Sequence, residues 1–347
     1  MHLTNKERFY RCAFGQDLDM LPIQVEFSAS GVQNYLKSKG ISKVSDLELL
    51  RFFDNHVLYA YMNGATLRLK TKDFNGERII TDEWGCDWDT SQDLFYCSHP
   101  LEDWELLESY RFPDPWAPGY LDYTEKLVQQ YAKDYIVTSY HFCCLFERAY
   151  ILRGFENVLV DFYAEEDLLC ALLDRITDFH VELAKRYISI GVNCGRIVDD
   201  YGSQHGMIMS PDMWRKYIKP RLQRIYDVYR NAGLPIIHHS CGNIMPIIGD
   251  LADMGVNVLN PVQPQALDLE KLAAEYGDRI AFFGGICNQT VLPHGTPEEI
   301  DEEVKRVTGI LGKNGRYVIS PSNGMGKDVP LENVEAFYAA AQKYRRI

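Results

Sequence analysis

The sequence predicts one α/β domain over residues 1–347, a (β/α)8 or TIM barrel with an inserted β-hairpin in its N-terminal half. The second half alternates apolar, β-branched runs with amphipathic helical patterns, which is typical of a parallel sheet covered by helices. The whole chain offers eight candidate strands, the number that closes such a barrel. Barrels of this class often exceed roughly 250 residues as one unit, so the length does not require a second domain.

The candidate elements are spread along the chain in order. Candidate strands lie at 21–27, 56–62, 134–139, 195–199, 235–240, 257–262, 280–286 and 317–322, and 56–62 fits a helix equally well. Helical periodicity covers 145–153, 166–190, 211–231, 243–254, 267–276, 297–312 and 330–345. Segments 66–72 and 78–90 flank Asn75-Gly76, a pair that favours a tight hairpin turn, and we interpret this hairpin as the insertion.

A doubly wound open sheet is the competing architecture. The chain has no GxGxxG after a strand and no GxxxxGK(S/T) motif, so nucleotide-binding versions of that fold lose support.

Composition narrows the classes of partner. A formal charge of −13 argues against nucleic acid or an anionic membrane surface, because both require basic protein surfaces. The nine cysteines are odd in number and form no small-domain framework. The N-terminus lacks an apolar signal-peptide stretch, and no window has the length of a membrane helix. These features predict a cytoplasmic protein with reduced thiols.

The segment His239-Ser240-Cys241 ends the candidate strand at 235–240. Residues two apart on a strand face the same side, so His239 and Cys241 can both point into the barrel mouth while His238 points away. Imidazole and thiolate are the preferred ligands of zinc, and catalytic groups gather at this end of barrel strands. The segment predicts a metal site, against the alternative of a buried histidine beside a structural cysteine.

A metal site needs further ligands, and three candidates lie at other strand ends: Asp199, Asp200 and Cys287. Adjacent aspartates on a strand point to opposite faces, so at most one should reach a common metal. The alternatives are turn or helix-cap roles for the aspartates and simple core packing for Cys287.

Other polar residues also fall at predicted strand ends. Glu26 is a carboxylate in an apolar setting, which is costly unless the group is paired or functional. Tyr140 and His141 follow the strand at 134–139 and are candidates for catalysis or for packing. Asn323 and Gly324 follow the last strand, where a loop of backbone donors can bind a ligand or cofactor.

Blocks across nearly the whole chain resemble the uroporphyrinogen decarboxylase (URO-D) superfamily. They are TNKERFYRCAFGQDLDMLPI, FERAYILRGFEN, DDYGSQHGMIMSPDMWRKYIKPRL, HHSCGNI, GVNVLNPVQ, FFGGICNQTVLPHGTPEEI and SPSNGMGKDVPLENV. The resemblance implies a (β/α)8 barrel and one of two chemistries. One is cofactor-free decarboxylation of uroporphyrinogen; the other is zinc-dependent methyl transfer involving a corrinoid protein.

The decarboxylase pattern fails in two places. Such enzymes carry an arginine-rich block after the first strand that clamps substrate carboxylates, and this chain has VEFSASGV there. They also use an aspartate after the second strand, whereas this sequence has no acidic residue between Asp54 and Lys70.

The methyltransferase pattern fits better. His239 and Cys241 match its H-x-C zinc motif, although the distant third cysteine falls in Ser320-Pro321-Ser322-Asn323, which has none. Asp199 or Asp200 would occupy the place of a carboxylate near the zinc.

The resemblance therefore implies a zinc-dependent methyltransferase that moves a methyl group between a small substrate and a corrinoid (cobalamin) on a partner protein. It is also compatible with a homodimer. Two alternatives stay open: a decarboxylase or lyase of the tetrapyrrole type, and a non-catalytic protein that binds a corrinoid or tetrapyrrole.

Overall fold

A five-stranded parallel sheet forms the centre of the molecule in a computed structural model that describes residues 2–41, 51–60, 72–74, 77–89 and 95–346. Its strand order is β11-β10-β9-β8-β7, so neighbours along the chain are also neighbours in the sheet. The strands are β7 (Gly195–Val198), β8 (Ile236–His239), β9 (Val258–Val262), β10 (Ala281–Ile286) and β11 (Tyr317–Pro321). All five confirm strands predicted from the sequence, with ends shifted by at most one residue.

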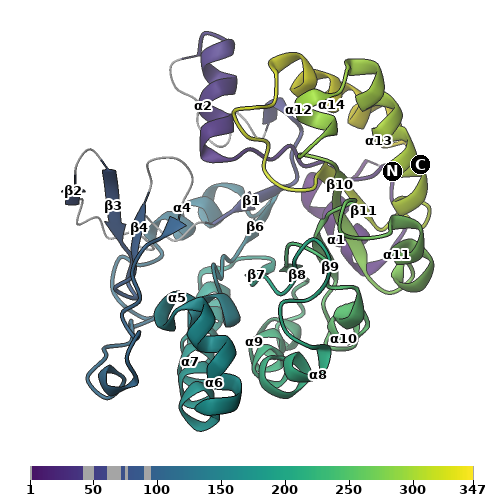
Figure 1. The fold of residues 1–347 in the computed structure, drawn as a ribbon. Helices are drawn as coiled ribbons and strands as arrows, with labels where there is room; N and C mark the ends of the chain where they lie inside the picture. Colours follow the sequence, from purple (N-terminus) through teal and green to yellow (C-terminus); the bar gives the residue numbers. More distant parts are fainter. Residues whose placement is uncertain (1, 42–50, 61–71, 75–76, 90–94, 347) are drawn as a thin grey trace.

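A second parallel pair continues this series. β1 (Val57–Tyr59) pairs with β6 (Ile136–Thr138), which shows that 57–59 is strand and not helix. Single parallel bridges join Thr138 to Cys194 and His141 to Ile197, so β6 lies beside β7. Figure 1 shows these strands following one another around the centre of the fold, with helices outside them.

The predicted first strand at 21–27 is replaced by isolated bridges, including Ile23 with Ile319 of β11. On the side that faces β1, hydrogen bonds from side chains replace the backbone-to-backbone hydrogen bonds of a regular sheet. Gln24 exchanges hydrogen bonds with the backbone of Val57, and Asn55 does the same with Val25. The described chain is thus an α/β fold of parallel sheets, and closure into an eight-stranded barrel stays a prediction.

Helices connect the strands and cover their outer side (Figure 1). Six predicted helical regions contain α5 (Phe146–Arg153), α7 (Glu166–Ile190), α10 (Ile248–Asp253), α11 (Leu269–Tyr276), α13 (Pro297–Leu311) and α14 (Leu331–Tyr344). The region 211–231 divides into α8 (Pro211–Met213), a π-helical turn η2 (Trp214–Ile218) and α9 (Lys219–Asn231). Pro220 explains the division, because its backbone has no N–H for a regular helical bond.

Several short helices were missed by sequence periodicity: α1 (Asn5–Phe14), α2 (Ala29–Ser38), α4 (Asp122–Tyr131), α6 (Phe155–Ala164) and α12 (Val291–His294), with the 3-10 turns η1 (Trp104–Leu106) and η3 (Met245–Ile247). α1 begins with a capping box between Thr4 and Glu7, a local signal that the sequence did contain.

An antiparallel sheet lies to one side of the parallel strands (Figure 1). It has the order β2-β3-β4-β5, with β2 (Lys72–Phe74), β3 (Glu77–Thr81), β4 (Asp87–Asp89) and β5 (Phe95–Tyr96). β2 and β3 pair around the predicted hairpin turn, although the turn residues 75–76 and the segment 66–71 lie outside the described residues. The predicted strand 78–90 is broken by a turn between β3 and β4, so its status as a simple inserted hairpin stays a prediction.

The apolar residues of the strands and of the inner helix faces form a continuous core. Fully buried aromatic side chains include Trp214 from η2 and Tyr226 and Tyr229 from α9. Within the described residues, none of the helices combines the length and the apolar character that spanning a membrane would require.

Candidate metal centre and substrate cavity

Alternation along β7 and β8 selects which side chains face a cavity at the ends of the strands. On β7, Arg196 and Val198 line a cavity of about 670 Å³, whereas Ile197 is fully buried in the core. On β8, His239 lines the same cavity. His238 faces the other way, where its Nδ1 hydrogen-bonds with the Tyr226 hydroxyl at 2.8 Å. The period of two along a strand thus places His239 as the sequence predicts.

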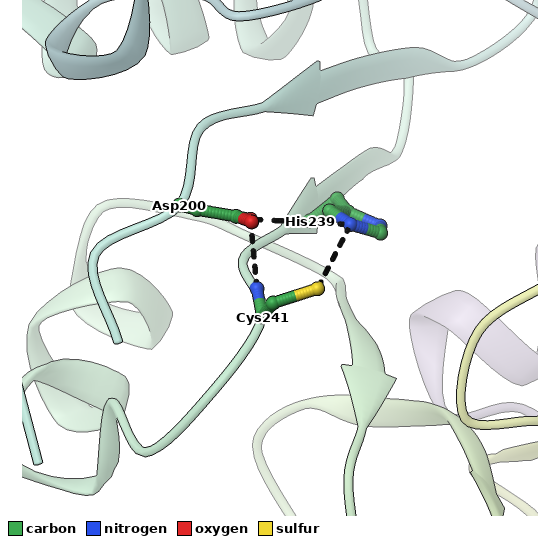
Figure 2. A group of neighbouring side chains, drawn as sticks. All are labelled: Asp200, His239 and Cys241. Atoms are coloured by element: carbon green, nitrogen blue, oxygen red, sulfur yellow. Dashed lines mark hydrogen bonds and ion pairs between the residues drawn. The ribbon is translucent and has the colours of Figure 1, made fainter. Parts of the chain in front are cut away.

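Asp200, His239 and Cys241 converge just beyond the ends of β7 and β8 (Figure 2). The Cys241 sulfur lies 3.7 Å from Nε2 of His239, and that nitrogen lies 4.0 Å from Oδ1 of Asp200. One ligand atom from each residue lies within 4.8 Å of the other two. The Cys241 backbone N–H donates to Asp200 Oδ1 at 2.8 Å, which fixes this carboxylate against the loop that carries the thiol.

Asn260 sets the orientation of the His239 ring. Its Oδ1 lies 2.7 Å from Nδ1 of His239, while its Nδ2 points to the Phe283 carbonyl at 3.5 Å. The amide oxygen therefore accepts a hydrogen bond from Nδ1–H, which leaves the lone pair of His239 on Nε2, toward Cys241 and Asp200. Sequence reasoning missed Asn260; the available signal was an amide inside the apolar run 257–262.

The donor set of this group suits zinc. One imidazole nitrogen, one thiolate sulfur and one carboxylate oxygen are three ligands that zinc takes in proteins, and a catalytic site keeps a fourth position open. Burial lowers the pKa of His239 to about 3, so its ring is neutral and able to coordinate. Burial, together with nearby Asp200, raises the pKa of the Cys241 thiol above its usual range. A cation at this position would reverse that effect and stabilise the thiolate.

Asp199 points away from this group and caps helix α5. Its carboxylate accepts from the backbone N–H groups of Phe146 at 3.0 Å and Glu147 at 2.8 Å, and from the Tyr201 hydroxyl. Burial raises its pKa to about 6, although these hydrogen bonds act in the opposite direction. The structure thus brings Asp200, and not Asp199, to His239 and Cys241, and gives Asp199 the helix-cap role that was the alternative.

Cys287 is not brought into the group either. It follows β10, where its sulfur lies 3.1 Å from the Thr290 hydroxyl and also contacts the Gln265 amide. Asn323 also lies beside the group, where its Nδ2–H donates to the Cys241 sulfur at 3.7 Å. Asn323 lies in the segment where the methyltransferase pattern has its third cysteine.

Glu147, on the first turn of α5, lies behind Asp200. Its Oε1 accepts from the Tyr150 hydroxyl at 3.2 Å, and its buried Oε2 has no hydrogen-bond partner among the described residues. Burial, then the charges of Asp200 and Asp199, raise its pKa well above the usual value. Sequence reasoning did not single out Glu147 as part of a buried acidic cluster.

The cavity beside the Asp200–His239–Cys241 group is lined by several of the predicted site residues. Glu26, Tyr140, Asn323 and Gly324 all line it, and the aromatic rings of its wall come from Phe27, Phe53, Tyr59, Tyr140 and Phe142. Glu26 is half-buried overall, but its Oε1 is covered and has no hydrogen-bond partner in the described part of the chain. Burial raises the pKa of Glu26 to about 7, a shift that the nearby Arg196 partly offsets.

His141 belongs to a separate buried cluster. Its Nδ1 lies 2.9 Å from Nδ1 of His180, and its Nε2 lies 2.7 Å from the Tyr229 hydroxyl. Both ring nitrogens are therefore engaged, and burial lowers the pKa of His141 to about 3. The structure places His141 in the core and not on the cavity wall, so of its two expected roles it takes packing.

Comparison with known proteins identifies relatives along most of the chain. A family model described as uroporphyrinogen decarboxylase (URO-D) matches residues 83–344. Methylcobamide:CoM methyltransferase MtbA of Methanosarcina mazei is 23% identical over 353 residues, covering 99% of this chain and 98% of that protein. MtbA of Methanosarcina acetivorans is 24% identical over 245 residues, covering 71% and 69%.

The other branch of the family also contains relatives. Uroporphyrinogen decarboxylase of Geobacter sulfurreducens is 24% identical over 262 residues, covering 71% of this chain and 73% of that protein. Among solved structures, a methyltransferase from Methanosarcina mazei superposes with a TM-score of 0.73 at 20% identity, covering 99% of both chains. That likeness shows a shared fold.

Proposed function

Because this chain belongs to the uroporphyrinogen decarboxylase family, we propose that it is a zinc-dependent methyltransferase of that family. It moves a methyl group between a small substrate and a corrinoid cofactor carried by a partner protein. The observation that best supports this proposal is the Asp200–His239–Cys241 group at the edge of the cavity. Relatives named as methylcobamide:CoM methyltransferases support the corrinoid. We further infer that residues 1–347 form one eight-stranded barrel domain.

His239, Cys241 and Asp200 would hold the zinc ion, and Asn260 would hold the imidazole with its Nε2 toward that ion. When bound, zinc supplies Lewis acidity, which activates a thiol acceptor or polarises a methyl-bearing heteroatom. The aromatic residues of the cavity wall limit water beside the reacting methyl group. Arg196 and Glu26 offer the substrate a positive charge and a hydrogen-bonding carboxyl group.

A tetrapyrrole decarboxylase is the second candidate, since such enzymes are also relatives. Its substrate carries many carboxylates and needs several cations around it. Among the described residues that line the cavity, the cations are Arg196 and Lys327, and the segment 25–32 contributes Glu26 and small or apolar residues. This lining favours a smaller substrate with few charges.

Metal content separates these candidates. We expect about one zinc per chain by elemental mass spectrometry, lost in Cys241→Ser and retained in a control at the exposed Cys97, Cys97→Ser. Methyl donors would then be screened with a corrinoid protein by following the corrinoid absorbance. No stoichiometric metal, even after zinc is supplied, would rule out the proposed zinc chemistry. Coproporphyrinogen formed from uroporphyrinogen would establish the decarboxylase instead.

A further inference from the structure

Glu26 brings a carboxyl group to the wall of the cavity that His239 also lines. Backbone hydrogen bonds fix the place of this residue. The carbonyl of Glu26 accepts from the Met325 N–H at 2.9 Å, and the preceding Val25 N–H donates to the Asn55 side chain at 2.6 Å. The backbone thus holds Glu26 at the cavity wall without occupying its carboxyl group.

The carboxyl group of Glu26 has no strong partner in the described part of the chain. Its Oε1 is covered from solvent and makes no hydrogen bond there. Among the described residues it also forms no ion pair with Arg196 or Lys327, the cations that line the cavity. A carboxylate removed from water without such partners is costly, so the neutral acid is favoured. Burial accordingly raises the pKa of Glu26 to about 7, and the charge of Arg196 offsets only part of this shift.

Other titratable and charged groups face the same cavity from several elements. They are Tyr59 of β1, Tyr140 after β6, Arg196 of β7, His239 of β8, and the exposed Lys327 and Asp328 after β11. Burial lowers the pKa of His239 to about 3, and arginine does not lose its proton in proteins, so neither exchanges a proton near neutral pH. A general acid or base works best when its pKa lies near the operating pH, and Glu26 meets this condition.

Methyl transfer to or from a heteroatom also moves one proton. When a methylcorrinoid methylates a thiol, the carbon–cobalt bond breaks, its electron pair stays on the corrinoid, and a carbon–sulfur bond forms. The corrinoid is thereby reduced by two electrons, and the thiol proton must leave the sulfur. When a methyl ether or amine gives its methyl group to the reduced corrinoid, the heteroatom keeps an electron pair and must take up a proton. Both directions need a group beside the heteroatom that exchanges one proton near neutral pH.

We propose that Glu26 is a catalytic residue of this cavity and exchanges that proton with the heteroatom of the substrate. Its carboxylate takes the proton from a thiol as the methyl group arrives, and its carboxylic acid returns one as a methyl group leaves. Because Glu26 and His239 line one cavity, a small substrate in that cavity lies beside both. This role rests on the proposed methyl transfer, whereas the proton that Glu26 holds in the free protein does not.

Infrared difference spectroscopy tests the proton on Glu26 without a metal or a substrate. The spectrum of the wild type minus that of Glu26→Gln should show one protonated carboxyl band that disappears with a midpoint near pH 7. Asp328→Asn, which removes an exposed carboxylate from the same cavity, should leave this band in place. A midpoint near the ~4.3 of an ordinary glutamate would overturn the inference.

Methyl transfer from free methylcobalamin to 2-mercaptoethanol, an uncharged thiol, tests the catalytic role. The wild-type kcat/KM should rise with pH through about 7, because the carboxylate is the form that accepts the thiol proton. Glu26→Gln should lower kcat by at least ~100-fold and remove this inflection, while KM stays within a factor of about three. Added imidazole should restore part of the lost rate, which a loss of packing would not explain. Asp328→Asn should keep the wild-type pH profile.

The two measurements separate this inference from the proposed function. A wild-type protein that shows the Glu26 band but transfers no methyl group would reject the methyl transfer and retain Glu26 as a proton-exchanging group of the cavity. An active wild type whose folded Glu26→Gln variant keeps its rate and its pH profile would reject the inference and retain the methyl transfer.

Discussion

The ends of β6 and β8 each present a histidine, and the two are used in opposite ways. His141, beyond β6, has both ring nitrogens engaged by His180 and Tyr229 inside the core. His239, at the end of β8, has Nδ1 engaged by Asn260 and Nε2 directed at a thiol and a carboxylate. A histidine is available for chemistry only where one nitrogen is oriented by a hydrogen bond and the other faces a cavity.

The largest expected effect is the loss of activity when His239, the histidine with a free ring nitrogen at the cavity, is replaced. His239→Gln should lower corrinoid methylation by at least ~1000-fold, because the metal loses its imidazole ligand. When both proteins are compared without metal, the free energy of unfolding should change by less than ~1 kcal/mol, since His239 lies at the cavity and not in the packed core. Turnover near the wild-type rate in this variant would show that the two histidines do not differ as we infer.

Asp200 and Cys287 allow a similar comparison between two candidate ligands, because only Asp200 lies in the group with His239 and Cys241. Asp200→Asn should weaken zinc binding by about 10- to 100-fold in a chelator competition assay. Cys287→Ser should leave zinc affinity within a factor of about two. Loss of zinc in Cys287→Ser, together with unchanged zinc affinity in Asp200→Asn, would show that Cys287 and not Asp200 is the zinc ligand.

Asn260 tests whether the orientation of His239 matters as well as its identity. Asn260→Ala should lower zinc affinity by ~10- to 100-fold, because nothing then holds Nδ1–H and the imidazole can turn. Asn260→Asp retains an oxygen acceptor and should recover most of the affinity. Equal zinc affinity in all three proteins would mean that the ring is held by packing alone.

The smallest effect concerns the buried histidine. His141→Gln should reduce the free energy of unfolding at pH 7.5 by ~2 kcal/mol, because it disturbs contacts to His180 and Tyr229. Metal content should not change. Denaturant unfolding with zinc measured in parallel would check both statements, and loss of zinc without loss of stability would contradict them.

The difference in unfolding free energy between wild type and His141→Gln should also depend on pH, and the direction of that dependence follows from the pKa of His141. The pKa of His141 falls to about 3 in the folded protein through burial, below the ~6.5 of an unfolded chain. The unfolded state therefore binds more protons between these values, and stability contributed by this residue is lost as the pH falls through that window. The stability advantage of wild type over His141→Gln should therefore fall by ~1.4 kcal/mol for each pH unit below about 6, reach zero near pH ~5 and change sign below it.

Much of this arrangement followed from sequence patterns. The five strands from Gly195 to Pro321 and the longer helices between them were predicted because long periodic segments carry a strong signal. The segment 21–27 was predicted as a strand but pairs through side chains of Gln24 and Asn55, a substitution that periodicity cannot reveal. Short helices such as α6 and α12 also escaped, since few turns give little pattern.

The sequence by itself determined the α/β class, the family resemblance and the placement of His239 and Cys241 at the end of one strand, because these depend on local period and local motif. Only the tertiary structure decided that Asp200 completes their group, that Asp199 caps α5 and that Cys287 stands apart. It also left the buried Nε of Arg196 without a hydrogen-bond partner among the described residues. These outcomes depend on distances between residues that are remote along the chain, and no local pattern encodes such distances.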